Sequence, residues 1–230
     1  MKLTYFSIPG KVLKSMYYGV RLFLRPHELN TLIQLANQLT DLKAFDEAVL
    51  HVKEDAQAKA LIAERYSPKP LNMEKLKTCA PGSFGLAYYN HMQAFGLTPY
   101  FAPDVSLASE KIYLRERQRV VHDYVHALLN IGTTVEEEAK LNAIFMVKGC
   151  SPFTSVIVAG AFFHFLFKRP SELVKLTREV NKGFNYGEQL RTPFAFRWEE
   201  HIHTPLSEVR ALMSAARPNV AELPQLEPRA

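Results

Sequence analysis

The sequence predicts an all-α protein, folded as a single-domain helical bundle. Apolar residues recur at the spacing of helix faces through most of the 230 residues, and no run with the two-residue period of a strand is long enough to build a sheet. Helix-start signals precede several of these apolar stretches. Hydrophobic residues make up 47% of the chain and charged residues 22%, which is ordinary for a globular domain with a proper core.

The N-terminal helices are expected over residues 1–66, and they either pack on the rest of the chain or face a membrane. Residues 11–25 are amphipathic and basic, as in a helix that lies on an anionic bilayer, but an ordinary packing helix with a charged edge has the same pattern. Pro26 ends this stretch. Apolar spacing predicts further helices over 27–40 and from 41 to about 66.

A short linker with two prolines, 67–70, leads into the helical core, which we place at residues 67–217. Ser83 is expected to cap a helix that runs through Phe95, and the next helix begins near Ser109. The segment 218–230 reads as a loose tail.

The helix that follows Ser109 contains His122, Asp123 and His126, which share one face because of the helical period. The helical pattern then breaks at residues 130–133. Thr134 and Glu137 form a capping box, which predicts that a second helix begins there.

An antiparallel hairpin about Gly132 would bring Glu138 to the height of His126, since each lies six residues from the glycine. Two imidazoles and two carboxylates then converge. The predicted metal ligands are His122, Asp123, His126 and Glu138. The nitrogen and oxygen set suits a divalent metal, and Zn, Mg, Fe, Mn and Co all remain candidates. A solvated polar face is the opposing interpretation, since the zinc-protease motif has Glu after its first His.

Arg115, Arg119 and the two histidines form one stripe along this helix. Guanidinium groups near a metal would suit an anionic substrate, because arginine binds carboxylate or phosphate through two hydrogen bonds. The alternative is that Arg115 and Arg119 pair with nearby acids such as Glu116.

Residues 153–167 are almost free of charge, and Ser151 with Pro152 predicts where that helix begins. Fifteen apolar residues are too few to span a bilayer, so the helix is expected to be buried or to line an apolar pocket next to the hairpin. The predicted lipid-tail residues are Phe153, Ile157, Ala161 and Phe165, with simple core packing as the alternative. Ser171 is expected to cap the following helix, which should end by Gly183 or Gly187.

Composition and motifs exclude several classes of function. The net charge of +5 favours anionic partners, but no dense basic block with interleaved aromatics occurs, so nucleic acid is not expected. Two cysteines without metal spacing fit a reducing compartment. No dinucleotide, nucleotide or serine-hydrolase motif is found.

The spacing HDYVH, eleven residues, then Glu138 resembles the HDxxH-x11-E motif of the coenzyme Q (ubiquinone) biosynthesis family known as coenzyme Q protein four. The segment PGSFGLAYYNHM at 81–92 and the block WEEHIHTPLSEVRAL at 198–212 are also similar to that family. Arg117 and Arg119 match its paired arginines ahead of the motif. The resemblance covers roughly residues 65–213.

This resemblance implies a role in ubiquinone biosynthesis, on polyprenylated ring precursors. It implies removal of the ring carboxylate with hydroxylation of the same carbon, and organisation of the other biosynthetic enzymes. In that reading the metal activates a ring oxygen or O₂, and the arginines Arg115, Arg117 and Arg119 hold the carboxylate. Two alternatives stay open: a non-catalytic protein that binds a prenyl lipid or prenyl phosphate, and a metal-dependent hydrolase.

The expected partners are a prenylated quinone precursor or prenyl phosphate, other quinone biosynthesis enzymes and a membrane surface, and a homodimer is a further candidate. Since no signal peptide or mitochondrial-type leader is apparent, the expected location is the bacterial cytoplasm, peripheral on the inner membrane face.

Overall fold

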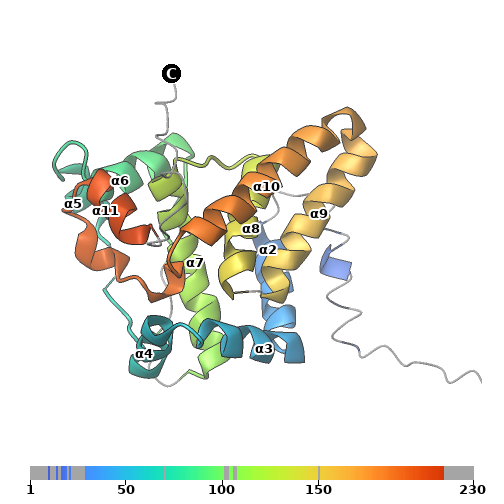
Figure 1. The fold of residues 1–230 in the computed structure, drawn as a ribbon, viewed down its shortest axis with the longest axis horizontal. Helices are drawn as coiled ribbons and strands as arrows, with labels where there is room; N and C mark the ends of the chain where they lie inside the picture. The colour runs from blue at the N-terminus through green and yellow to red at the C-terminus, as the bar shows by residue number, and fades with distance from the viewer. Residues whose placement is uncertain are drawn as a thin grey trace, which may run out of the picture.

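The computed structural model describes residues 10, 14, 17–19, 21, 29–69, 71–100, 104–105, 108–149 and 151–214. These residues contain helices, two isolated β-bridges and no β-strand, so the all-α prediction is confirmed (Figure 1). Most of the basic stretch 11–25 and the whole tail 218–230 lie outside the described residues, and the expectations for them stay predictions. The α-helices are α2 (Leu29–Thr40), α3 (Lys43–Val52), α4 (Ala56–Glu64), α5 (Met73–Lys77), α6 (Phe84–Ala94), α7 (Glu110–Leu129), α8 (Val135–Gly149), α9 (Pro152–Lys168), α10 (Leu173–Gln189) and α11 (Leu206–Met213).

Several helix starts predicted from the sequence are confirmed, and each of them has a side-chain cap. The Ser83 hydroxyl accepts a hydrogen bond from the backbone N–H of Leu86, and Ser109 does the same for α7. Ser151 caps α9 with Pro152 in its first turn. At the start of α8, the N–H of Thr134 donates to Glu137 and the N–H of Glu137 donates to the Thr134 hydroxyl, which is the predicted reciprocal capping box.

The prediction for α10 was wrong at both ends. A 3-10 turn, η1 (Pro170–Glu172), precedes the helix, and Ser171 lies inside that turn instead of capping α10. The helix also continues through Gly183 and Gly187, because both glycines face α8 at very short range. A Cβ atom on Gly183 would lie 2.2 Å from the carbonyl oxygen of Lys140, and one on Gly187 would lie 2.8 Å from the Cβ of Val147. The glycines thus serve close helix packing, and their helix-breaking tendency is overridden.

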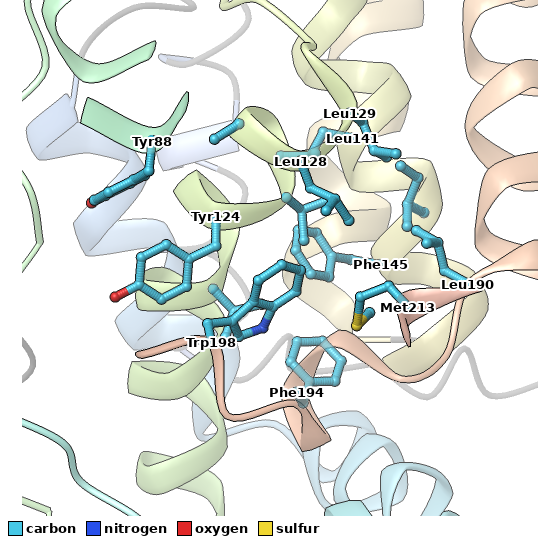
Figure 2. Packing of buried hydrophobic residues seen from close by; sticks show 14 of the residues in the cluster. Tyr88, Tyr124, Leu128, Leu129, Leu141, Phe145, Leu190, Phe194, Trp198 and Met213 are labelled. Carbon is cyan, nitrogen blue, oxygen red and sulfur yellow. The ribbon is translucent and has the colours of Figure 1, made fainter. Parts of the chain in front are cut away.

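The C-terminal segment folds back onto the start of α6. The N–H groups of Phe84 and Gly85, which have no partner within the helix, donate to the carbonyls of Thr204 and Ile202 at 2.9 Å each. The same segment contributes Trp198, which is 0% exposed and donates its indole N–H to the carbonyl of Pro193. Figure 2 shows Trp198 among the core side chains, and its ring centroid lies 5.9 Å from that of Tyr124. This core fixes α6 and the C-terminal segment against α7, the helix that carries the two histidines.

The sequence predicted that α9 is buried or lines an apolar pocket, and the structure buries one part of the helix and exposes another. Val158, Ala161 and Phe165 are buried in a cluster with residues of α8 and α10, whereas Phe163 and Phe167 are exposed. Within the described part of the chain, no helix is both long enough and apolar enough to cross a bilayer.

Candidate metal centre

Three of the four predicted ligands lie together between α7 and α8. The Nε2 atoms of His122 and His126 are 3.0 Å apart. The carboxylate of Glu138 lies 3.3 Å from each of them, one oxygen toward each imidazole. The predicted hairpin therefore brings Glu138 to the height of His126.

The turn between the two helices also orients His126. Asn130, and not Gly132, adopts the left-handed conformation that ends α7, with φ of 49°. This turn brings the N–H of Ile131 to the carbonyl of His126 at 3.0 Å. The carbonyl of Ile131 in turn lies 3.0 Å from Nδ1 of His126. Because a carbonyl only accepts, Nδ1 must carry the proton, which leaves the lone pair of Nε2 facing His122 and Glu138.

The distances among the three donor groups fit a shared cation. Atoms bound to one divalent metal at about 2.0–2.2 Å are separated by about 2.8–3.6 Å at octahedral or tetrahedral angles. The observed separations of 3.0, 3.3 and 3.3 Å lie within this range. Two imidazole nitrogens that approach within 3.0 Å repel each other unless a proton or a cation lies between them. The residues present therefore fit a divalent metal bound by two nitrogens and a carboxylate.

Electrostatics at the site favour an anionic Glu138 with a positive charge beside it. Burial raises the pKa of Glu138, but His122 and His126 outweigh it and leave the pKa well below its ordinary value. Burial lowers the pKa of His122, yet Glu138 and Asp123 raise it more, and the net shift is upward. A positive charge is thus stabilised between these side chains, as a proton or as a metal ion.

Asp123 lies beside the group formed by His122, His126 and Glu138 and is not part of it. Among the described residues, those three offer donor atoms within 4.8 Å of one another, and Asp123 is not grouped with them. It still interacts electrostatically with all three residues. Burial raises the pKa of Asp123. The two imidazoles lower this pKa by a smaller amount, so the net shift is upward. Its role as a fourth ligand stays a prediction.

His91 on α6 also lies near the site, and the sequence analysis did not predict it there. Its ring stacks on that of His126 with centroids 5.3 Å apart and planes 23° apart, and the residue is 7% exposed. The segment 95–109 separates α6 from α7 in the chain, so no local spacing pattern could have paired these two rings.

The three arginines predicted to bind a substrate anion have different environments. Arg117 is buried with Glu199, 4% and 6% exposed, and also donates to the carbonyl of Phe196, so its guanidinium is used inside the protein. Arg115 and Arg119 both contact Glu116, whose side chain is 2% exposed, as the alternative interpretation expected. Two guanidiniums share one carboxylate, which leaves one positive charge in excess. The Nη2 group of Arg119 is buried and donates no hydrogen bond within the described residues.

The four predicted lipid-tail residues of α9 do not line an open pocket. Phe153 and Ile157 pack against the buried Leu35 and Leu39 of α2, and Ala161 and Phe165 are 6% and 0% exposed in the core. This burial agrees with the alternative of simple core packing, and the role of these four residues as lipid-tail contacts stays a prediction. The open groove lies on another face. It has a volume of about 320 Å³ and is lined by Ala159, Phe162, Phe163, Leu166 and Leu173.

Fold and site together define an all-α protein with a candidate two-histidine, one-carboxylate metal centre on an antiparallel helix hairpin. Residues 7–219 match the family model described as coenzyme Q (ubiquinone) biosynthesis protein Coq4. The chain belongs to this family, as the HDxxH-x11-E resemblance had indicated.

Similar proteins include a mitochondrial ubiquinone biosynthesis protein of Penicillium rubens, 27% identical over 67% of this chain and 54% of the relative. The mitochondrial homologue of Aedes aegypti is 26% identical over 64% of this chain and 53% of the relative. The chain thus spans about half the length of these curated relatives. A crystal structure of a Nostoc punctiforme protein assigned to ubiquinone biosynthesis has a TM-score of 0.77, with 21% identity, over 88% of this chain and 97% of the other. At that identity the likeness establishes the shared fold.

Proposed function

We propose that this protein binds a divalent metal and a polyprenylated ring precursor of ubiquinone, and that it catalyses oxidative decarboxylation and hydroxylation of the ring. The observation that carries this proposal is the arrangement of His122, His126 and Glu138, whose donor atoms have the mutual distances of a metal coordination shell. Three protein ligands leave at least one coordination position open, as catalytic metal sites require. With Asp123 as a fourth ligand, the metal would have to be five- or six-coordinate to remain reactive.

In the proposed reaction the ring carboxylate leaves as CO₂ and one oxygen atom of O₂ enters as the hydroxyl group. The second oxygen atom leaves as water, which requires two electrons and two protons from an external two-electron donor. The bound metal would supply activation of O₂ or of a ring oxygen. The protein residues would hold the metal and orient the ring.

Arg115 and Arg119 are the proposed contacts for the ring carboxylate. Their combined charge exceeds that of Glu116 by one, and Arg119 precedes His122 by one helical turn. The unused Nη2 group of Arg119 supports this role, because a buried donor without a partner costs about 1–3 kcal/mol that a bound anion would recover. Arg117 is not part of this proposal, because Glu199 already neutralises it.

The groove on α9 is the proposed site of the prenyl chain. Its lining is apolar, and each buried methylene contributes about 0.8 kcal/mol, so the chain could supply most of the binding free energy. The same groove supports a second candidate function, in which the protein binds a prenyl lipid or prenyl phosphate without catalysis and presents it to the other biosynthetic enzymes. We further propose a peripheral location on a membrane surface, where prenylated compounds reside.

Turnover of a carboxyl-labelled prenylated hydroxybenzoate separates the two functions. The purified chain is incubated with this compound, O₂ and a chemical reductant, and labelled CO₂ and hydroxylated product are measured. We expect both products from the wild type and from His51→Ala, a control in an exposed histidine of α3, and neither from His126→Ala. If the precursor co-purifies in an organic extract but is never turned over, the catalytic proposal is wrong and the binding function remains. If the extract holds no prenyl lipid either, both are refuted.

A further inference from the structure

Large apolar side chains are exposed together where α9 ends and α10 begins. Phe163 is 56% exposed, Leu166 49%, Phe167 68% and Val174 60%. These are four of the eight large apolar residues exposed in the described part of the chain, and the other four are scattered over other elements. Single exposed apolar residues are common, but a contiguous group marks an interaction surface. We call residues 159–178 the α9–α10 tip.

The tip projects from the body of the protein. In Figure 1, α9 and α10 run side by side and are joined at a far end of the molecule, away from α4 and α5. The apolar groove lined by Ala159, Phe162 and Leu173 opens on this part of the hairpin. A narrow projecting end with aromatic and aliphatic side chains can enter a lipid layer without displacing the rest of the fold.

Basic residues follow the apolar side chains of α9 closely in the sequence. Residues 168–178 contain four basic side chains, Lys168, Arg169, Lys175 and Arg178, against one acidic side chain, Glu172. Glu136 of α8 adds one more acid, 3.3 Å from Arg169 and 2.9 Å from Lys175. Four positive and two negative charges leave an excess of two, and Lys168 and Arg178 are both exposed. An apolar centre with a basic edge is complementary to a bilayer of anionic lipids.

The tip is also connected to the metal centre. Arg169 and Lys175 bind Glu136 in the first turn of α8, two residues before Glu138. The α9–α10 turn and the helix start that carries a metal ligand are therefore held together. A lipid that enters the groove from a bilayer would approach the protein on this side.

We propose that the α9–α10 tip docks on an anionic lipid bilayer, with Phe163, Leu166 and Phe167 inserted among the acyl chains and Lys168 and Arg178 at the headgroups. This inference rests on the proposed function, in which the substrate has a prenyl chain that resides in a membrane. A second copy of the chain is the less suitable occupant, because a two-fold contact through this surface would oppose two basic edges.

Binding of the full chain to lipid vesicles tests the apolar part of the proposal. The vesicles are either phosphatidylcholine alone or an equimolar mixture with phosphatidylglycerol. The variant Phe163→Ser/Phe167→Ser is compared with Leu50→Ser, a control in a residue of α3 that is 65% exposed. We expect the double variant to bind the mixed vesicles at least about tenfold more weakly, and the control to bind like the wild type.

A second pair of variants tests the charges. Lys168→Glu and Lys59→Glu change the net charge equally, but Lys59 is exposed on α4, remote from the tip. We expect only Lys168→Glu to weaken binding to the mixed vesicles, by about tenfold, with little effect on phosphatidylcholine alone. In Phe167→Trp, the new indole should shift its emission to the blue on vesicle binding, while the buried Trp198 contributes a constant background.

Three results would overturn the proposal: a wild type that binds neither vesicle, a double variant that binds like the wild type, or a double variant that only dissociates a homodimer on gel filtration. Metal content distinguishes failure of the docking proposal from failure of the proposed function. We expect Phe163→Ser/Phe167→Ser to keep its metal, and His126→Ala to lose its metal and keep vesicle binding. Each part can therefore fail without the other.

Discussion

Replacing Gly183 by alanine should destabilise the protein, because α8 and α10 are in backbone contact at this position. The added Cβ would lie 2.2 Å from the carbonyl oxygen of Lys140 and 2.8 Å from the Cβ of Ala143. Ordinary contact requires the helices to separate by about 1 Å. Overpacking costs about 1–3 kcal/mol, here at the upper end because a backbone atom must move, and the helix propensity of alanine returns about 1 kcal/mol.

The expected net loss is about 2 kcal/mol in the free energy of unfolding, or roughly 4–8 °C in Tm for a chain of this length. Differential scanning calorimetry measures it. Gly160→Ala on α9 is the matched control, since a Cβ there meets no atom within 4 Å. That variant should gain about 0.5–1 kcal/mol. If Gly183→Ala is as stable as Gly160→Ala, the inferred helix contact is wrong.

Three further predictions concern charged residues. Arg117→Met leaves Glu199 buried without its guanidinium partner and should cost about 3–5 kcal/mol in urea denaturation; a loss below 1 kcal/mol would contradict the buried pair. Burial raises the pKa of Glu179, but Lys140 and Lys182 lower it more, so its contribution to stability is present above the ordinary carboxyl pKa and is lost as the pH falls. Thermal melts from about pH 6 down to pH 3 should therefore show a steeper loss of Tm for the wild type than for Glu179→Gln, and parallel curves would refute this. If Asp123 is the fourth ligand, Asp123→Asn should weaken zinc binding at least tenfold in calorimetric titration, whereas unchanged affinity would leave three ligands.

Local sequence signals predicted the features that depend on neighbouring residues. The caps at Ser83, Ser109 and Ser151 and the capping box of α8 follow from hydrogen bonds within one helical turn. The convergence of His126 and Glu138 followed from their equal distance to the turn. The break in the helical pattern at residues 130–133 was also predicted, and Asn130 ends α7 there in the left-handed conformation that asparagine tolerates.

Features that depend on packing between remote segments could not be read from the sequence. Gly183 was predicted to end its helix, because glycine often does so. Its position inside α10 follows from the close contact with α8, which the local sequence does not reveal. Arg117 looked available for a substrate because Glu199, its partner, lies more than eighty residues away in the chain. Which face of α9 is covered could not be predicted, because the exposed Phe163 and the buried Phe165 have the same chemistry.

Metal content after purification tests the central claim most directly. Elemental analysis of the wild type and of His51→Ala should find one divalent metal ion per chain, and a chelator should lower the Tm of both proteins. His126→Ala should contain no stoichiometric metal, and its Tm should not respond to the chelator. A wild type without metal that gains no Tm from added Zn, Mn or Fe, or a His126→Ala variant that keeps its metal, would contradict the account.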